Sequence, residues 1–243
     1  MIIQVKKISK ILSIALTSSM VFGAPWAVLA KGDISELDKN TVTVTGEDAG
    51  ENSFFGVAFR TKYIDRWAIS IKSENESLND HLMDTARIAH MLALIKNKKF
   101  GGNINVDRIA VLAMYHDLTE VITGDMPTPV KYYNDDIKNV YKNIECIAGK
   151  RLLDMLPEEF RSDYEPFFEK KDEDKELWKL VKAADKISAL IKCIEEYRMG
   201  NREFEKALEA QQKKIEDINL DEVKYFREHF LDSYYLTLDE HTK

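Results

Sequence analysis

This chain of 243 residues has only two cysteines and no excess of positive charge. Its two cysteines, Cys146 and Cys193, lie among apolar helical residues and form no zinc-ligand pair with a nearby histidine. We therefore expect both to be small buried side chains. The formal net charge is -7 and no basic stretch dominates, which argues against a nucleic acid polymer as partner, because binding one requires many neutralised phosphates. A small substrate that carries one phosphate needs only a local positive charge.

Alternating strand patterns, internal repeats and low-complexity tracts are also missing. From Phe54 onward, apolar residues recur instead at the spacing of amphipathic helices. The helices predicted from this spacing cover 80–97, 106–116, 137–152 and 177–194, with two more polar helices near 202–216 and 221–233. With 44% apolar residues, the chain is long enough for one domain with its own core. These features predict an all-α bundle.

The first thirty residues differ from the rest of the chain. Three lysines precede an apolar stretch, and the segment ends in small residues of the kind that signal peptidase accepts. We predict a cleavable signal peptide over 1–30 and hence an exported protein; the alternative is a misassigned start, or an added leader on a cytoplasmic protein. Residues 31–52 are polar and lack a helical period, which predicts a flexible linker. The folded domain is then expected over 53–243.

Four residues of the kind that bind metals interrupt the apolar helix pattern. His81 stands at the start of the first core helix, and the pair His116-Asp117 ends the second. Asp185 lies on the apolar stripe of the fourth helix, where an ionised carboxylate is costly unless it is paired or bound to a metal. Each has an ordinary alternative: Asp185 at the edge of its stripe beside a lysine, and His116-Asp117 as a helix end with a capping carboxylate. The order His, His-Asp, Asp over several helices is nevertheless the signature of the HD superfamily of metal-dependent phosphohydrolases, and facing helices commonly build such sites.

The segment after His116-Asp117 carries a closer resemblance. It contains Glu120 and then the run TGDMPTPVKY over 123–132. With the Arg66-Trp67 pair before it, and matching residues toward the C-terminus, this run resembles the YfbR-like 5′-deoxynucleotidases over about residues 53–240. The resemblance implies an HD-domain helical bundle with a metal site between core helices. It also implies hydrolysis of deoxyribonucleoside 5′-monophosphates and a tendency to form homodimers.

The resemblance further implies roles for individual residues. The implied ligands of one divalent ion are His81, His116, Asp117 and Asp185. Imidazole and carboxylate ligands suit Mn, Co, Zn or Fe better than Ca, and we expect Co or Mn, with Zn or Fe as alternatives. Glu120 matches the residue that does acid/base work, one helical turn from the HD pair. Arg66 and Trp67 match a substrate-contacting pair, and Asp125 matches the residue that lies against the sugar and favours the 2′-deoxy form.

The chain departs from the family pattern at several places, including residues 170–173, to which we assign no role. Asp80 replaces the glutamate that usually precedes the first histidine, residues 68–71 lack the family's proline and arginine, and the leader is unusual in a cytosolic family. The changes at Asp80 and at residues 68–71 bear on substrate preference and rate. One alternative is another HD hydrolase, acting on a cyclic nucleotide, a (p)ppGpp-like molecule or a nucleoside triphosphate, which the 123–132 run argues against. Another is a catalytically inactive nucleotide-binding HD protein, which the presence of Glu120 argues against.

Overall fold

The computed structural model of the chain describes residues 52–131 and 133–242. The predicted signal peptide over 1–30, and all of the predicted linker except Asn52, lie outside the described residues, so both stay predictions. Within the described ranges, no helix is both long enough and apolar enough to cross a membrane.

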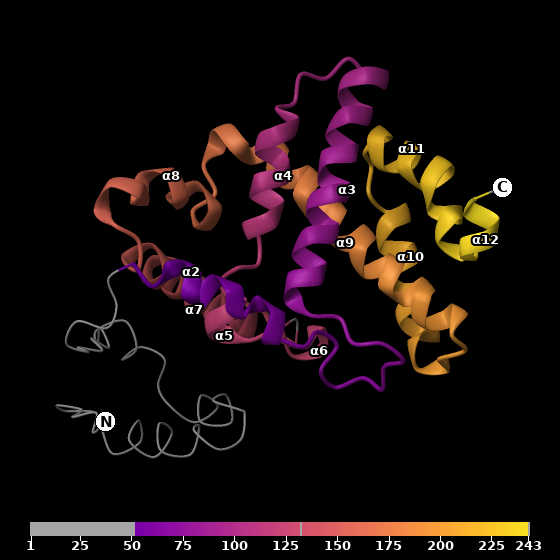
Figure 1. Cartoon of the computed structure of the whole chain (residues 1–243), viewed down its shortest axis with the longest axis horizontal. Coiled ribbons are helices and arrows are strands. Elements are labelled where there is room, and N and C mark those ends of the chain that lie inside the picture. Colours follow the sequence, from indigo (N-terminus) through magenta and orange to yellow (C-terminus); the bar gives the residue numbers. More distant parts are fainter. Residues whose placement is uncertain (1–51, 132, 243) are drawn as a thin grey trace. The chain divides into compact units, whose positions relative to one another are not determined.

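The described residues form helices joined by short connections (Figure 1), which confirms the all-α prediction. The α-helices are α2 (Phe54–Ala58), α3 (Leu78–Lys99), α4 (Val106–Tyr115), α5 (Glu120–Thr123), α6 (Thr128–Lys131), α7 (Asp135–Asp154), α8 (Glu158–Phe168), α9 (Lys175–Arg198), α10 (Glu205–Glu216), α11 (Asp221–Phe230) and α12 (Leu238–His241). Short 3-10 helices lie at η3 (Phe59–Tyr63), η4 (Asp172–Asp174), η5 (Arg202–Phe204) and η6 (Leu231–Tyr235). The four long helices predicted from apolar spacing correspond to α3, α4, α7 and α9.

Three helices form the centre of the domain, because α3 packs against both α4 and α9 (Figure 1). The helix α9 also contacts α4 and α10, so apolar residues are buried along most of its length, from Leu177 to Ile194. Each large apolar side chain buried in this way contributes about 1.5–3 kcal/mol relative to exposure. This packing sets the relative positions of the segments that carry His81, His116 and Asp185.

A capping box fixes the start of α3. Ser77 Oγ accepts a hydrogen bond from the backbone N–H of Asp80, and the Asp80 carboxylate accepts one from the backbone N–H of Ser77. Such caps contribute about 1 kcal/mol to helix stability. Asp80 therefore serves the helix end one residue before His81, and an aspartate satisfies this cap in place of the family's glutamate.

A smaller apolar cluster joins α2, α7 and α8. Within it, the ring of Phe54 packs edge-on against Tyr164 on α8, with centroids 5.1 Å apart. The apolar spacing did not predict α8, which is mostly polar and contains Pro166. Cys193 is buried as predicted, whereas the prediction for Cys146 is wrong, since this residue is exposed. Cys146 lies on α7, which buries only a narrow face in the smaller cluster.

Candidate metal centre

Three helix segments bring four metal-binding side chains to one place. His81 comes from the first turn of α3, Asp185 comes from the middle of α9, and His116 is the C-cap residue of α4, followed by Asp117. One nitrogen or carboxylate oxygen from each side chain lies within 4.8 Å of those from the other three. The residues predicted as ligands therefore form one cluster, which we call the His/Asp cluster.

The histidine Nε2 atoms of the His/Asp cluster face its carboxylates. His81 Nε2 is 3.1 Å from Asp185 Oδ1. His116 Nε2 is 3.1 Å from Asp117 Oδ2 and 3.9 Å from Asp185 Oδ1. Burial, together with the nearby positive charge of Arg66, lowers the pKa of His81 to about 4. The His81 ring is therefore neutral near pH 7, which is the form that binds a metal.

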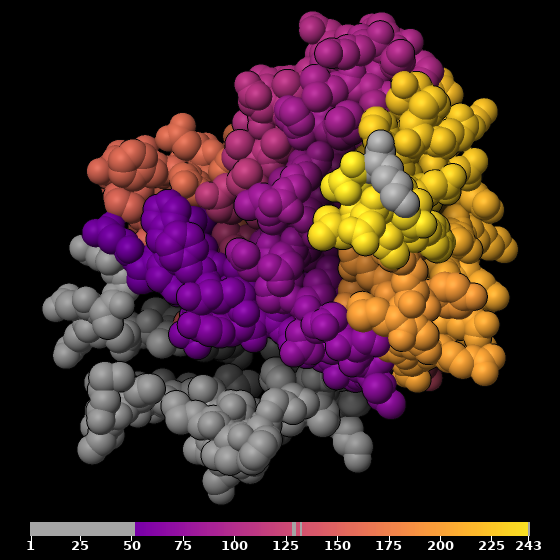
Figure 2. Space-filling view, turned by 45° about the vertical axis from the view of Figure 1, so that its right-hand side comes forward, coloured from indigo at the N-terminus to yellow at the C-terminus, as the bar shows by residue number. Residues whose placement is uncertain are grey.

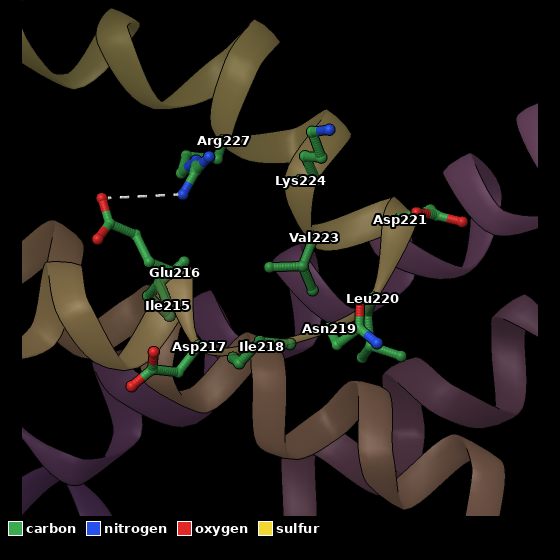
Figure 3. Close-up of a pocket in the computed structure, with 10 residues that line it drawn as sticks. All are labelled: Ile215, Glu216, Asp217, Ile218, Asn219, Leu220, Asp221, Val223, Lys224 and Arg227. Carbon is green, nitrogen blue, oxygen red and sulfur yellow. Dashed lines mark ion pairs between the residues drawn. The ribbon is translucent and has the colours of Figure 1, made fainter.

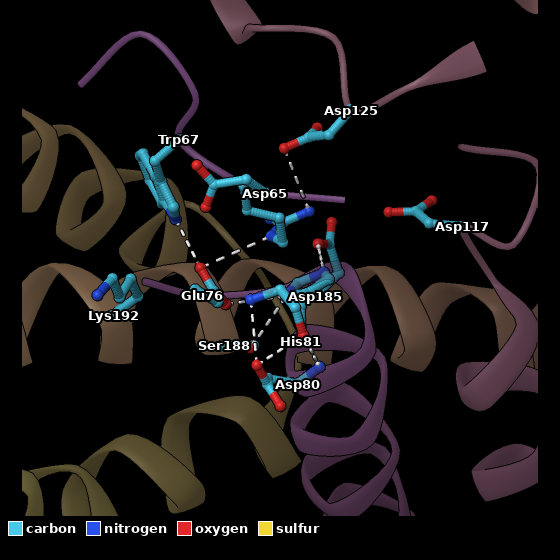
Figure 4. A network of polar contacts seen from close by, with 12 residues as sticks. Asp65, Trp67, Glu76, Asp80, His81, Asp117, Asp125, Asp185, Ser188 and Lys192 are labelled. Carbon is cyan, nitrogen blue, oxygen red and sulfur yellow. Dashed lines mark hydrogen bonds and ion pairs between the residues drawn. The ribbon is translucent and has the colours of Figure 1, made fainter. Parts of the chain in front are cut away.

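The other ring nitrogen of each histidine is held by a neighbour. His81 Nδ1 lies 3.1 Å from Ser188 Oγ, and Figure 4 shows these two side chains in contact. His116 Nδ1 lies 2.8 Å from the Ala113 carbonyl oxygen. Since a carbonyl only accepts, His116 Nδ1 carries a proton, and Nε2 is the ring nitrogen that faces the carboxylates. Contacts of this kind orient histidine ligands toward a metal.

The donor set fits a divalent ion. Neither histidine Nε2 atom makes a well-formed hydrogen bond with any described residue, although both are buried. Nitrogen and oxygen ligands bind such ions at about 2.0–2.2 Å, so two donors on opposite sides of an ion lie at most about 4.4 Å apart. The observed limit of 4.8 Å between donor atoms is close to this span. The four donor atoms are therefore spaced much as the ligands of one ion would be.

Arg66 places a positive charge beside the His/Asp cluster. Its Nη1 is 3.9 Å from Asp125 Oδ2, and its Nε is 3.7 Å from Glu76 Oε2. Burial disfavours the charged guanidinium, but the carboxylates of Asp125 and Glu76 outweigh this effect and raise the pKa of Arg66. Arg66 therefore stays charged, and its planar fork of N–H groups suits a phosphate. This acidic chain thus has the local positive charge that a phosphorylated substrate requires.

Trp67 is held in a conformation that few non-glycine residues adopt. Its φ of 56° lies in the left-handed region, which costs about 1–2 kcal/mol and persists only where surrounding contacts impose it. Those contacts are visible in Figure 4: Trp67 Nε1 donates a hydrogen bond to Glu76 Oε2 at 2.7 Å. The indole ring also lies 5.2 Å from the ring of Phe204. Glu76 therefore contacts both members of the Arg66-Trp67 pair, although nothing in its local sequence marks it as a site residue.

Glu120 is a buried carboxyl group next to the His/Asp cluster. It begins α5, it is 3% exposed, and its Oε2 has no hydrogen-bond partner among the described residues. Burial raises the pKa of Glu120 well above its usual value, and the negative charges of Asp117 and Asp125 raise it further. A carboxyl group that keeps its proton to higher pH can act as a general acid. The structure thus brings Glu120, Arg66 and Asp125 to the same side of the molecule as the metal-binding residues.

A separate cavity of about 180 Å³ lies at the junction of α10 and α11 (Figure 3). It is lined by residues 215–221 with Val223, Lys224 and Arg227, and Arg227 Nη1 lies 4.0 Å from Glu216 Oε1 at its rim. None of the eight residues predicted for the site borders it. This cavity belongs to the packing of the C-terminal helices, and the His/Asp cluster is the place where the reactive side chains gather.

Comparison with known proteins gives an assignment that agrees with this geometry. The family model "5′-deoxynucleotidase YfbR-like" matches residues 53–234. This chain belongs to that family. A 5′-deoxynucleotidase of Vibrio cholerae is 46% identical over 190 residues, covering 78% of this chain and 98% of the relative. The 5′-deoxynucleotidase YfbR of Escherichia coli is 45% identical, covering 78% of this chain and 96% of the relative.

A solved structure shows the same fold. An HD-domain phosphohydrolase from Listeria innocua superposes with a TM-score of 0.67 at 21% identity, covering 79% of this chain and 92% of that chain. This likeness confirms the predicted HD-domain bundle. The family match confirms the resemblance that the HD pair and the run over 123–132 carry, and the family's members are phosphomonoesterases.

Proposed function

We propose that this chain hydrolyses deoxyribonucleoside 5′-monophosphates to deoxynucleoside and inorganic phosphate. One observation carries the proposal: a metal-binding His/Asp cluster, a charged arginine and a buried glutamate of raised pKa meet at one place in a member of the YfbR-like family. The proposed ligands of a single divalent ion are His81, His116, Asp117 and Asp185. The proposed substrate-contacting residues are Arg66, Trp67 and Asp125.

The side chains around the His/Asp cluster have separate roles in the proposed hydrolysis of a phosphate monoester. When bound, a divalent ion lowers the pKa of a water molecule and offsets charge on the phosphoryl oxygens. Arg66 binds the phosphate through two N–H groups of its planar fork. Glu120 donates its proton to the departing 5′ oxygen, so that the deoxynucleoside leaves as a neutral alcohol. Asp125 follows Gly124, whose φ of 76° turns the chain, and its Oδ2 lies 3.9 Å from Arg66 Nη1, a position from which we propose that it contacts the sugar.

A substrate panel tests the proposal. The purified protein is treated with chelator, supplied again with one metal at a time, and assayed for phosphate release. We expect release from deoxyribonucleoside 5′-monophosphates, with little release from the 3′ isomers and from ribonucleotides. Equal turnover of the 5′ and 3′ monophosphates would contradict the proposal. Activity confined to a cyclic nucleotide, a (p)ppGpp-like molecule or a nucleoside triphosphate would assign the chain to another HD hydrolase activity.

The same experiment tests the identity of the metal. Two imidazoles with two carboxylates suit Co or Mn, and we propose these ions first, with Zn and Fe as the alternatives. Elemental analysis of the purified protein should find about one ion for each chain. Restoration of activity by Co or Mn, but not by Ca, is the expected result.

Two further proposals concern assembly and location. The family resemblance suggests a homodimer, and light scattering on the purified protein should give twice the mass of one chain. The lysine-rich start, apolar stretch and small residues of 1–30 suggest export after cleavage. Mass analysis of the mature N-terminus should then find Lys31 first, whereas an intact N-terminus in the cytoplasmic fraction would contradict export.

A further inference from the structure

The segment that carries Arg66 is a loop with little apolar anchoring. Residues 65–77 connect η3 to α3, and the β-bridge between Asp65 and Ser77 closes the loop at its base. Its two isoleucines cannot hold it, because Ile69 and Ile71 are 70% and 76% exposed. Apart from the packing of Trp67 against Phe204, polar contacts therefore set the position of this segment, which we call the Arg66 loop.

Those contacts come from a row of polar side chains on the mostly apolar, packed face of helix α9. Asp185, Ser188, Lys192 and Glu196 are separated by three, four and four residues, so they follow one line along the helix. The first two serve the metal centre, since Asp185 belongs to the His/Asp cluster and Ser188 contacts His81. The other two lie further along the same line and face the Arg66 loop.

Glu196 and Lys192 bind the backbone of the Arg66 loop. The backbone N–H groups of Ser73 and Glu74 donate to the two Glu196 carboxylate oxygens at 2.8 and 3.2 Å. Lys192 Nζ donates to the Glu74 carbonyl oxygen at 2.7 Å and to Glu196 Oε1 at 2.6 Å. Asn201 Nδ2 donates to Glu196 Oε2 at 2.7 Å and to the Ile71 carbonyl oxygen at 2.8 Å. In Figure 2, the purple segment before α3 lies against the orange segment near residue 200, in agreement with these bonds.

The buried ion pair of Lys192 and Glu196 does more than stabilise the fold. Glu196 is 0% exposed and Lys192 is 5% exposed. Removing two charges from water costs several kcal/mol for each ion, and well-packed apolar residues often replace buried ion pairs without loss of stability. The pair does, however, satisfy backbone donors and an acceptor of the loop at fixed positions, which apolar side chains cannot do. Its specific contribution is thus the placement of residues 71–74.

The anchored residues lead directly to Arg66. The backbone N–H of Arg66 donates to the Glu76 carbonyl oxygen at 2.9 Å, two residues after the anchored Glu74. Lys72 Nζ, from inside the anchored stretch, donates to the Arg66 carbonyl oxygen at 2.8 Å. The Glu76 side chain then holds Trp67 and faces Arg66 Nε, as Figure 4 shows for its bond to Trp67. Displacement of residues 71–76 would therefore move the guanidinium relative to Asp185, which is on the same helix as the anchor.

We infer that Lys192 and Glu196 are positioning residues for the substrate: they hold the Arg66 loop so that the Arg66 guanidinium meets the phosphate at the metal centre. The inference rests on the proposed function, in which Arg66 binds the phosphate. Neither residue touches the substrate, and their effect passes through the backbone of residues 71–76. Helix α9 thus positions both Asp185, a proposed metal ligand, and the loop that carries Arg66.

A double-mutant cycle in the full-length chain tests the inference. In the Arg66 background, Glu196→Gln should raise KM for a deoxyribonucleoside 5′-monophosphate and lower kcat/KM about tenfold. In the Arg66→Ala background, Glu196→Gln should have no further effect, because no guanidinium remains to be placed. The matched control is Glu195→Gln, an exposed carboxylate on the same helix, which should leave the kinetics unchanged. Asn201→Ala, a milder change at a half-buried residue, should act in the same direction by about threefold.

Two further measurements distinguish a positioning role from a general loss of structure. Hydrogen exchange at the amides of Ser73 and Glu74 should become faster in Glu196→Gln, while the metal dissociation constant, measured by titration calorimetry, stays within about twofold of wild type. An equal loss of activity in both backgrounds, or unchanged exchange at these amides, would overturn the inference and leave the proposed function intact. If Arg66→Ala itself has wild-type kinetics, the role of Arg66 in the proposed function fails and the inference fails with it.

Discussion

The metal-binding residues lie on or directly beside the three packed helices α3, α4 and α9, whereas Arg66 and Trp67 lie in a loop and Asp125 lies in a turn. Apolar packing among long helices positions the first group. Hydrogen bonds from buried polar side chains position the Arg66 loop, which carries Arg66 and Trp67. We therefore expect the two halves of the site to respond differently to substitution, the metal half through metal affinity and stability, and the loop half through substrate kinetics.

The largest effect is expected from Asp185→Asn in the metal half. The amide lacks the negative charge that would offset a divalent ion, so metal and activity should be lost together, by about 1000-fold or more in kcat. Elemental analysis and circular dichroism should show an unloaded but folded protein. Retention of the metal at full occupancy would remove Asp185 from the ligand set.

Glu120→Gln should leave the metal in place and slow the chemical step. A glutamine keeps the shape but has no acidic proton to transfer, so we expect kcat to fall about 10²–10⁴-fold with KM little changed. The raised pKa of Glu120 also predicts that activity falls as the pH rises through this pKa and the proton is lost. A pH profile of Glu120→Gln that keeps this fall would show that another group produces it.

The two halves of the site should also differ in how strongly a substitution lowers the free energy of unfolding, which Leu92→Ala and Ile69→Ser test. Leu92 is fully buried on α3, and its truncation should lower the free energy of unfolding by about 2–5 kcal/mol through lost contacts and a cavity. Ile69→Ser, in the exposed part of the Arg66 loop, should change it by no more than about 0.5 kcal/mol. Urea denaturation of both variants measures the difference. A large destabilisation by Ile69→Ser would mean that apolar contacts also hold the loop.

We expect acid to weaken the contacts between Glu196 and the Arg66 loop. Burial raises the pKa of Glu196, but hydrogen bonds from Lys192, Ser73, Asn201 and Glu74 outweigh this effect and lower the pKa to about 2. A folded-state pKa below the unfolded value gives stability that is present above about pH 4.5 and is lost as the pH falls toward 2. This contribution is on the order of 3 kcal/mol, since each pKa unit corresponds to about 1.4 kcal/mol.

Glu196→Gln should therefore approach wild type in unfolding free energy as the pH falls from 4.5 to 2. The control Glu195→Gln should not lose stability relative to wild type above pH 4.5, because burial raises the pKa of Glu195 rather than lowering it. A constant difference in unfolding free energy between Glu196→Gln and wild type across this range would indicate that folding does not lower the pKa of Glu196.

Much of the framework was predictable because helical apolar spacing is a local property of the chain. The stripes over 80–97 and 177–194 predicted α3 and α9 to within a few residues at each end. The family motifs then indicated which polar residues on these helices belong together. A mostly polar helix that contains a proline, α8, and the exposed Cys146 were beyond this reasoning, because both depend on which faces the tertiary packing leaves uncovered.

The sequence by itself determined the all-α class, the family and the set of eight residues proposed for the site. Only the tertiary structure decided how those residues are held: that Ser188 contacts His81, that Glu76 connects Trp67 with Arg66, and that the Arg66 loop is bound to α9. The physical reason is that these contacts join backbone and side-chain groups far apart in the chain. No local period or spacing records them, because they exist only once apolar packing has brought α3 and α9 together.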